Sequence, residues 1–255
     1  MNVITHRGLE PSQKNFPPES SLEAFKSHLE RGFGIEFDPY FTSGDILVTH
    51  NLSKPSPSLI QVLNLIRKQG NTSPNALHFK GKFQTSKKTD KLLKILSLYP
   101  DVVSGLIIFD VKPEIAPIIR SKLPAVGLAP SVADEYDISR YNSAVSGTLL
   151  SVSEAIRYKS YYDWAWLDEW DLQKPGGLSK KFYTQKTFST LRRAGYKIAA
   201  VTPELHGTSP GLLGGEFHPD SQTLPGLMKR ISEIISLHPD SVCTDYPEEV
   251  KKLIL

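Results

Sequence analysis

The sequence predicts an α/β fold, a single (β/α)8 TIM barrel that spans residues 1–255. Short β-rich runs alternate with segments of helical periodicity along the chain, and eight such strand–helix units can be traced. No proline- or glycine-rich linker separates a second domain. Repeated strand–helix units require a parallel sheet, and this number favours a closed barrel. A Rossmann-type sheet is disfavoured because no Gly-x-Gly-x-x-Gly motif follows a predicted strand.

The predicted strands are short apolar or β-branched runs at residues 2–5, 34–41, 76–80, 105–111, 125–129, 164–170, 197–205 and 241–245. Residues 45–49 extend the second strand or form a small hairpin arm that carries His50. Helices are expected at residues 22–31, 58–67, 87–99, 113–123, 184–194, 224–237 and 247–255, with more helical material before residue 158. Ser20 and Glu23 have the spacing of a capping box at the start of the first helix.

Composition and charge exclude several classes of protein. The formal net charge of +3 gives no reason to expect a nucleic-acid partner. The single cysteine, Cys243, excludes an internal disulfide framework and fits a reducing compartment. No signal peptide is visible, and no window approaches the roughly 18 apolar residues of a membrane span. A cytoplasmic protein without a membrane span is therefore expected, and the sequence gives no indication of its oligomeric state.

Titratable or charged residues stand at the C-terminal ends of most predicted strands, where a barrel carries its chemistry. They are His6, Arg7, Glu36, Asp38, His78, Lys80, Asp110, Asp168, Glu204, His206 and Asp245. Any one of the carboxylates could instead be the N-cap of the next helix. Asp245, which precedes Tyr246 and Pro247, is expected to be such a cap. Together, however, these residues favour a functional site on one rim.

The most informative part of this rim is a carboxylate pair flanked in the chain by two histidines. Alternation along a strand places Glu36 and Asp38 on the same side, where they could hold a hard divalent cation. His6 and His50 could donate and accept protons near neutral pH. Arg7, with Lys80 (at the end of the third strand), supplies positive charge suited to a phosphate. This combination favours phosphoester cleavage over glycoside cleavage.

Several spaced motifs resemble the glycerophosphodiester phosphodiesterase family. They are His6-Arg7-Gly8, Pro18-Glu19-Ser20-Ser21-Leu22-Glu23-Ala24-Phe25, Gly34-Ile35-Glu36-Phe37-Asp38, Val48-Thr49-His50 and Thr244-Asp245-Tyr246-Pro247. The resemblance implies a (β/α)8 barrel that hydrolyses glycerol-linked phosphodiesters of lipid metabolism with a bound Mg²⁺ or Ca²⁺. It also implies that His6 and His50 are the general acid and base, that Arg7 contacts phosphate, and that Glu36 and Asp38 are metal ligands. Later segments resemble a short, insertion-lacking branch associated with bacterial surface-polysaccharide loci.

The chain departs from the family pattern at three places. Asn51 stands where the family usually has aspartate, and His78 stands where it has a glutamate that ligates the metal. The family's usual insert after the second histidine is also missing. We expect the third ligand to be His78, Asp110 or Asp168, and an imidazole there would shift the metal preference toward Mn²⁺ or Zn²⁺.

Three functions are compatible with these residues. The first is a metal-dependent phosphodiester hydrolase that acts on a small glycerol- or sugar-linked phosphodiester. The second is a non-catalytic barrel that binds a phospho-sugar or glycan phosphate, which the loss of the strand-three glutamate suggests. The third is a retaining glycosidase with Asp168 and Glu204 as its working pair. The glycine-rich loop at residues 206–222, which leaves the rim beside Glu204 and His206, is predicted to close over the substrate.

Overall fold

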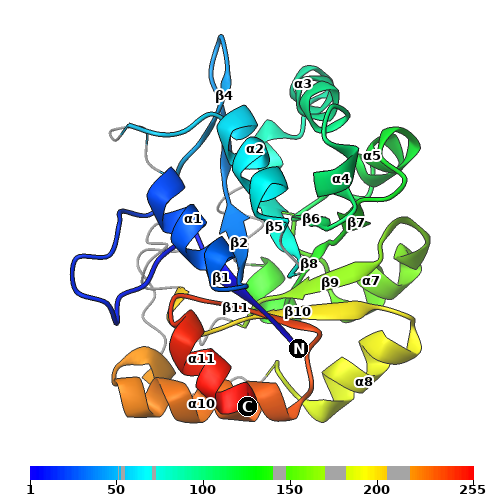
Figure 1. The fold of residues 1–255 in the computed structure, drawn as a ribbon. Coiled ribbons are helices and arrows are strands. Elements are labelled where there is room, and N and C mark those ends of the chain that lie inside the picture. Colours follow the sequence, from blue (N-terminus) through cyan, green and yellow to red (C-terminus); the bar gives the residue numbers. More distant parts are fainter. Residues whose placement is uncertain (51, 53–54, 71–72, 140–147, 170–181, 206–218) are drawn as a thin grey trace.

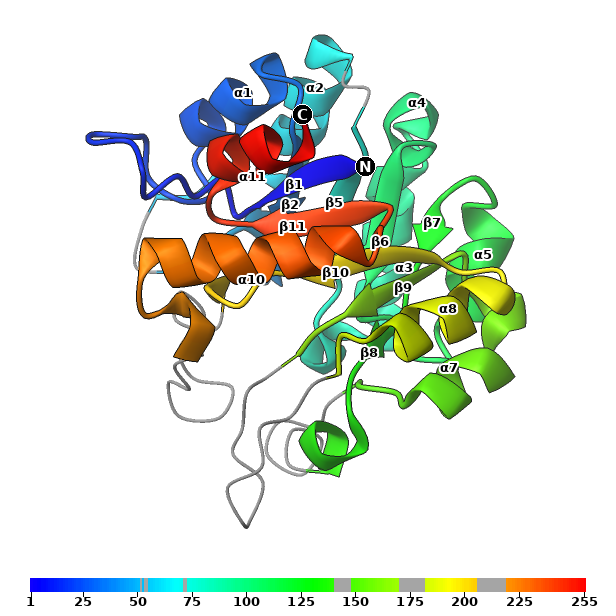
Figure 2. The ribbon, with the colours of Figure 1, turned by 90° about the horizontal axis from the view of Figure 1, so that it is seen from below.

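The computed structural model describes all residues except 51, 53–54, 71–72, 140–147, 170–181 and 206–218. Within the described part, nine strands form one sheet in the order β7-β6-β5-β2-β1-β11-β10-β9-β8. Every pairing between neighbours in this order is parallel. The sheet curls inside a layer of helices (Figure 1). Seen from below, β1, β11, β10 and β9 run side by side, with α10 and α8 outside them (Figure 2).

The strands of this sheet are β1 (Asn2–His6), β2 (Gly34–Phe37), β5 (Asn75–His78), β6 (Leu106–Phe109), β7 (Gly127–Leu128), β8 (Ser131–Val132), β9 (Trp164–Leu167), β10 (Lys197–Val201) and β11 (Ser241–Thr244). The α-helices are α1 (Leu22–Glu30), α2 (Leu59–Gln69), α3 (Ser86–Leu96), α4 (Pro100–Val103), α5 (Ala116–Lys122), α7 (Val152–Arg157), α8 (Gln185–Arg193), α10 (Leu224–Ser236) and α11 (Pro247–Ile254). Single 3-10 turns are η1 (Gly81–Phe83), η2 (Lys159–Tyr161) and η3 (Pro219–Ser221). No helix in the described residues has the length and apolarity needed to cross a bilayer.

The predicted TIM-barrel-like α/β fold is confirmed, but the strict count of eight strands is not. The predicted strand at residues 125–129 is instead two short strands, β7 and β8, with Ala129 and Pro130 between them. Proline has no N–H to give to a sheet, so it interrupts the regular pairing. Its carbonyl still accepts the N–H of Trp166 at 3.0 Å. β7 pairs with β6 and β8 pairs with β9, so the two ends of the strand order are adjacent in the chain.

The predicted strand at residues 34–41 divides at Asp38, and its second part forms a hairpin. β3 (Pro39–Phe41) pairs antiparallel with β4 (Ile46–Val48). This matches the hairpin alternative for residues 45–49. The N–H of Thr49 donates to the carbonyl of Asp38 at 3.0 Å. The hairpin therefore returns the chain to Asp38 immediately before His50.

The first helix begins one residue later than the predicted capping box requires. Ser21 is its N-cap, and the Ser21 hydroxyl accepts the N–H of Ala24 at 3.1 Å. Ser20 instead has a φ of 59° and its N–H donates to the carbonyl of Arg7 at 2.7 Å. A left-handed residue cannot take the extended conformation of an N-cap, so the choice of Ser20 was wrong. The turn ties the start of α1 to the end of β1.

Apolar side chains pack on both faces of the curled sheet. The larger cluster joins strand residues such as Ile35 and Leu77 to helix residues such as Phe25 and Leu63. A second cluster contains residues of the opposite face, from the strands and the segments next to them, namely Ile4, Ala76, Ile107, Phe109, Ala129, Trp164, Trp166, Ala199, Val201, Leu205 and Cys243. Side chains alternate along a strand. His6 and His78, two residues beyond Ile4 and Ala76, therefore continue this inner face at the C-terminal rim.

Candidate active site

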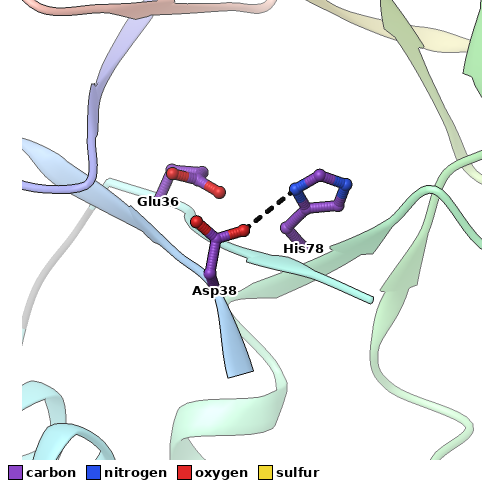
Figure 3. A group of neighbouring side chains, drawn as sticks. All are labelled: Glu36, Asp38 and His78. Atoms are coloured by element: carbon purple, nitrogen blue, oxygen red, sulfur yellow. Dashed lines mark ion pairs between the residues drawn. The ribbon is translucent and has the colours of Figure 1, made fainter. Parts of the chain in front are cut away.

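Three predicted metal ligands come together at the C-terminal rim. Glu36 lies near the end of β2, Asp38 follows that strand, and His78 ends β5. One potential ligand atom from each lies within 4.8 Å of the others. Figure 3 shows the two carboxylates and the imidazole turned toward a common space, with an ion pair between Asp38 and His78. The shared side predicted for Glu36 and Asp38 agrees with this arrangement.

Asp38 is the member of this group with two cationic partners. Its Oδ1 lies 3.1 Å from Nδ1 of His78 and 3.0 Å from Nζ of Lys80. Burial opposes ionisation, but Lys80 and His78 hold the pKa of Asp38 well below its usual value. Burial and the charge of Asp38 raise the pKa of Glu36. A bound divalent cation would lower the pKa of both carboxyl groups, so that Glu36 would be ionised together with Asp38.

The donor chemistry also fits a divalent cation. Oδ1 of Asp38 is buried, and within the described residues its contacts are two ion pairs that do not have the geometry of hydrogen bonds. Carboxylate oxygens suit hard cations, and an imidazole nitrogen adds affinity for Mn²⁺ or Zn²⁺. Among the described residues, Glu36, Asp38 and His78 form the group that meets this spacing.

Asp110 lies on the other side of the His78 ring. Its Oδ2 is 3.4 Å from Nε2 of His78, and its Oδ1 accepts the hydroxyl of Thr148. Burial disfavours a charged imidazole, yet Asp110 and Asp38 together raise the pKa of His78 to about 9. Asp110 is not a helix cap, since Ile115 is the N-cap of α5. Its prediction as a metal ligand stays a prediction, because it is outside the group of three.

The orientation of His78 is also supported by stacked rings. The imidazole stacks on Phe109 with centroids 4.5 Å apart, and Phe109 stacks on Trp166 with centroids 3.8 Å apart. These rings come from β5, β6 and β9, so the stack crosses the inner face of the sheet. The stack and the two carboxylates therefore fix the His78 ring at the rim.

His6 forms a pair that sequence reasoning missed. Its Nδ1 lies 2.9 Å from Oδ1 of Asp245, which is fully buried. The prediction that Asp245 caps α11 was wrong, because Tyr246 is the N-cap and makes no side-chain capping bond. The strand register contains the signal that was overlooked. Thr5 pairs with Thr244 in adjacent parallel strands, so His6 and Asp245 are level with each other.

The other predicted catalytic and phosphate-binding residues surround the three-residue group. Arg7 is buried, and Nη1 of its guanidinium lies 3.3 Å from Oε2 of Glu19. The backbone N–H of Arg7 donates to Oε2 of Glu36 at 3.2 Å. His50 is exposed on one side, and desolvation by the groups on its other side and the charge of Lys80 lower its pKa. The charges of His6 and Arg7 also act on His50. Because Thr49, the residue before it, donates its N–H to the carbonyl of Asp38, His50 lies on the same rim.

The opposite side of the rim carries the remaining candidates. Asp168 is half-buried and its N–H donates to the carbonyl of Val132 at 3.1 Å. Glu204 is buried and accepts hydrogen bonds from Thr202 and Thr244. The predicted residues His206 and Asn51, and residues 206–218 of the predicted lid, lie outside the described part of the chain.

A scan against models of known protein families finds no match to this sequence, and a search of curated proteins also finds none. Solved structures do match. A glycerophosphodiester phosphodiesterase candidate from Galdieria sulphuraria aligns over 100% of this chain and 98% of its own, with 16% identity and a TM-score of 0.66. Glycerophosphodiester phosphodiesterases from Parabacteroides distasonis and Agrobacterium tumefaciens also match.

More distant matches have other activities. A calcium-dependent phosphoinositol-specific phospholipase C from a Pseudomonas species aligns over 96% of this chain and 89% of its own, with 10% identity and a TM-score of 0.52. A chitinase from Chromobacterium violaceum aligns over 99% of this chain and 98% of its own, with 8% identity and a TM-score of 0.53. At these identities the matches establish a shared fold. The side chains at the rim must decide between activities.

Proposed function

We propose that this protein is a metal-dependent phosphodiester hydrolase, and that it cleaves a glycerol- or sugar-linked phosphodiester with His6 and His50 as its acid–base pair. The observation that carries the proposal is that the group of Glu36, Asp38 and His78 lies beside the imidazoles of His6 and His50. The charge of His6 acts on Glu36 and the charge of Asp38 acts on His50, which supports a common site. The fold shared with glycerophosphodiester phosphodiesterases adds to this support.

His6 and His50 divide the proton transfers between them. One imidazole removes a proton from water or from a neighbouring substrate hydroxyl, and the other protonates the departing alkoxide. The carboxylate of Asp245 accepts the Nδ1 proton of His6, which leaves the lone pair of a neutral ring on Nε2. The lowered pKa of His50 keeps its ring neutral at pH 7 in the absence of substrate.

Glu36, Asp38 and His78 would hold the divalent ion. When bound, the ion would supply positive charge that offsets the charge of the phosphate. Mg²⁺ or Ca²⁺ suits the two carboxylates, whereas Mn²⁺ or Zn²⁺ suits the added imidazole. His78 must lose its ring proton before it can act as a ligand, so metal affinity should rise with pH.

Lys80 and Arg7 are proposed as the phosphate contacts. The side chain of Lys80 is 23% exposed and Nζ lies at the edge of the metal group, 3.0 Å from Asp38. Arg7 is more deeply placed, but its charge acts on both Glu36 and His50. A phosphate between the two imidazoles would therefore lie within the field of two cations.

The test is hydrolysis of bis(p-nitrophenyl) phosphate and of a glycerophosphodiester, with and without chelator. The wild type should be active with added metal, and His6→Ala or His50→Ala should reduce turnover by roughly 10²–10⁴-fold. His238→Asn is the matched control, because His238 is exposed and its φ of 57° suits asparagine. It should keep wild-type turnover.

Three results would count against the proposal. Full activity of metal-free protein would exclude a metal-dependent reaction. Near wild-type turnover in either rim histidine variant would exclude that residue as acid or base. Saturable binding of a phospho-sugar without any turnover would favour the alternative of a non-catalytic binding barrel.

A further inference from the structure

Glu204 is a buried carboxyl group with no part in the chemistry proposed above. It follows β10, and the residue is 7% exposed. Its Oε1 accepts the hydroxyl of Thr244 at 2.6 Å and the backbone N–H of Asp245 at 2.9 Å, and it lies 2.6 Å from the hydroxyl of Thr202, which shares its one proton with the carbonyl of Cys243 at 2.9 Å. A single oxygen thus contacts three donors from two neighbouring strand ends.

These contacts fix the short connection that carries Asp245. β11 ends at Thr244 and α11 begins at Pro247, so Asp245 and Tyr246 alone join the two elements. The Thr244 hydroxyl accepts the N–H of Tyr246 at 3.0 Å while it donates to Glu204. Glu204 therefore holds the backbone on both sides of the Asp245 side chain. That side chain contacts Nδ1 of His6 at 2.9 Å.

A carboxyl group is a costly choice for a purely structural contact at this position. Oε2 of Glu204 is buried and has no hydrogen-bond partner among the residues that the structure describes. Burial and the nearby charge of Asp245 also raise the pKa of Glu204. Unpaired buried oxygen atoms and adjacent buried carboxyl groups both lower stability. Such local costs are most common where they serve a functional site.

We propose that Glu204 is a positioning residue, which holds Asp245 so that the Asp245 carboxylate keeps the His6 imidazole in one orientation and one tautomer. The role rests on the proposed function of His6, but the contact chain from Glu204 to Asp245 to His6 can be tested without turnover. Small displacements of a catalytic group can reduce rates by about 10²-fold. The Glu204 contacts prevent such a displacement at the end of β11.

The kinetic test compares Glu204→Ala with Glu204→Gln. Glutamine keeps an oxygen that can accept the same three donors, whereas alanine removes it. We expect Glu204→Ala to reduce kcat by about 10–100-fold with little change in KM, and Glu204→Gln to retain most of the wild-type kcat. Asp245→Asn combined with Glu204→Ala should lose little more than either single variant, because both act through His6.

The second readout is ¹⁵N NMR of the histidine ring nitrogens, with the His6 signals identified from their loss in His6→Ala. Glu204→Ala should shift the His6 tautomer signals in the same direction as Asp245→Asn does, and Glu204→Gln should not. Ile231→Val, on the buried face of α10, controls for general destabilisation and should leave these signals unchanged.

The NMR result separates this inference from the proposed function. If the wild type hydrolyses no phosphodiester, shifted His6 signals in Glu204→Ala would still support the positioning role. Wild-type His6 signals and wild-type kcat in Glu204→Ala would overturn it, whatever the effect on melting temperature. A glutamine variant as defective as the alanine variant would also overturn it, since the acceptor atom is retained.

Discussion

The rim contains two clusters of buried carboxyl groups that are stabilised in different ways. Around Asp38 the partners are the cations His78 and Lys80, whose side chains are 24% and 23% exposed. Around Glu204 the partners are hydroxyls and a backbone N–H, all buried. The partly exposed Lys80 can move aside for a ligand, and His78 can lose its ring proton to become one, whereas the buried backbone contact of Glu204 cannot change in this way. The first cluster is therefore suited to binding, and the second is suited to holding a neighbouring group in place.

The two clusters also differ in backbone strain. Arg7 and Asp110 have left-handed φ values and contact Glu36 and His78 beside Asp38, and Asn15 and Ser20, which are also left-handed, lie between β1 and α1. Beyond residue 110, His238 is the described non-glycine residue with such a φ. Left-handed backbone in other residues than glycine costs free energy and is often found at functional sites. The strain thus coincides with the cluster proposed to bind metal and substrate.

The largest expected effect comes from removing the charge of Asp38. Asp38→Asn keeps the shape of the side chain but deprives His78 and Lys80 of their shared anion. Turnover and calorimetric metal affinity should each fall on the order of a hundredfold or more. Asp90→Asn, at an exposed position of α3, should change neither. Wild-type metal affinity in Asp38→Asn would mean that this cluster is not the binding side of the rim.

A buried ion pair outside both clusters, between Arg230 of α10 and Glu169, should contribute far more to stability than an exposed ion pair. The side chain of Arg230, 9% exposed, pairs with the buried Glu169 and contacts Glu233 at 2.8 Å. Arg230→Met leaves Glu169 buried without its cation, so the free energy of unfolding in urea should fall by about 3–5 kcal/mol. Arg157→Met is the control, because Arg157 is 64% exposed and 3.8 Å from Glu154, and it should cost less than about 1 kcal/mol. Similar losses in both variants would contradict the distinction.

The pH dependence of the free energy of unfolding should show the contribution of the ion pairs in the cluster around Asp38. The pKa of His78 is raised to about 9, above the unfolded value of about 6.5. Its ion pairs therefore stabilise the folded state fully below pH 6.5, and this contribution, at most about 3 kcal/mol, is lost as the pH rises toward 9. Urea unfolding in chelator at pH 6–9.5 should show the loss, and His78→Gln should remove it.

His28 is an internal control, because its pKa is shifted in the opposite direction to that of His78. Burial and the Arg31 charge lower its pKa to about 4, so its contribution is lost as the pH falls from about 6.5 toward 4. His28→Gln should therefore leave the alkaline loss in place. An alkaline loss that persists in His78→Gln would show that another group causes it.

The smallest expected effect concerns the strained turn at Ser20. Ser20 has a φ of 59°, and within the described part of the chain its buried hydroxyl has no hydrogen-bond partner. Ser20→Gly should therefore raise the free energy of unfolding by about 1 kcal/mol. Ser104→Gly, at a right-handed helix end with a φ of −63°, should lower it by about 0.5–1 kcal/mol instead. A destabilised Ser20→Gly would show that the turn does not store strain.

The sequence by itself determined the local features of this protein. Periodicity over a few residues predicted the alternating strands and helices, because it depends on which face of each element is buried. The same alternation placed Glu36 and Asp38 on one side, two residues apart. The spacing of the hairpin also allowed His50 to return beside Asp38.

Only the tertiary structure decided the contacts between distant strands. Asp245 was expected to cap a helix, yet it contacts His6 across 239 positions of the chain. The position of Asp110 against His78 and the break at Pro130 were likewise not predicted. A helix cap and a partner for a distant histidine have the same local sequence. The outcome is fixed by the register of parallel strands and the packing around them, which are properties of the whole sheet.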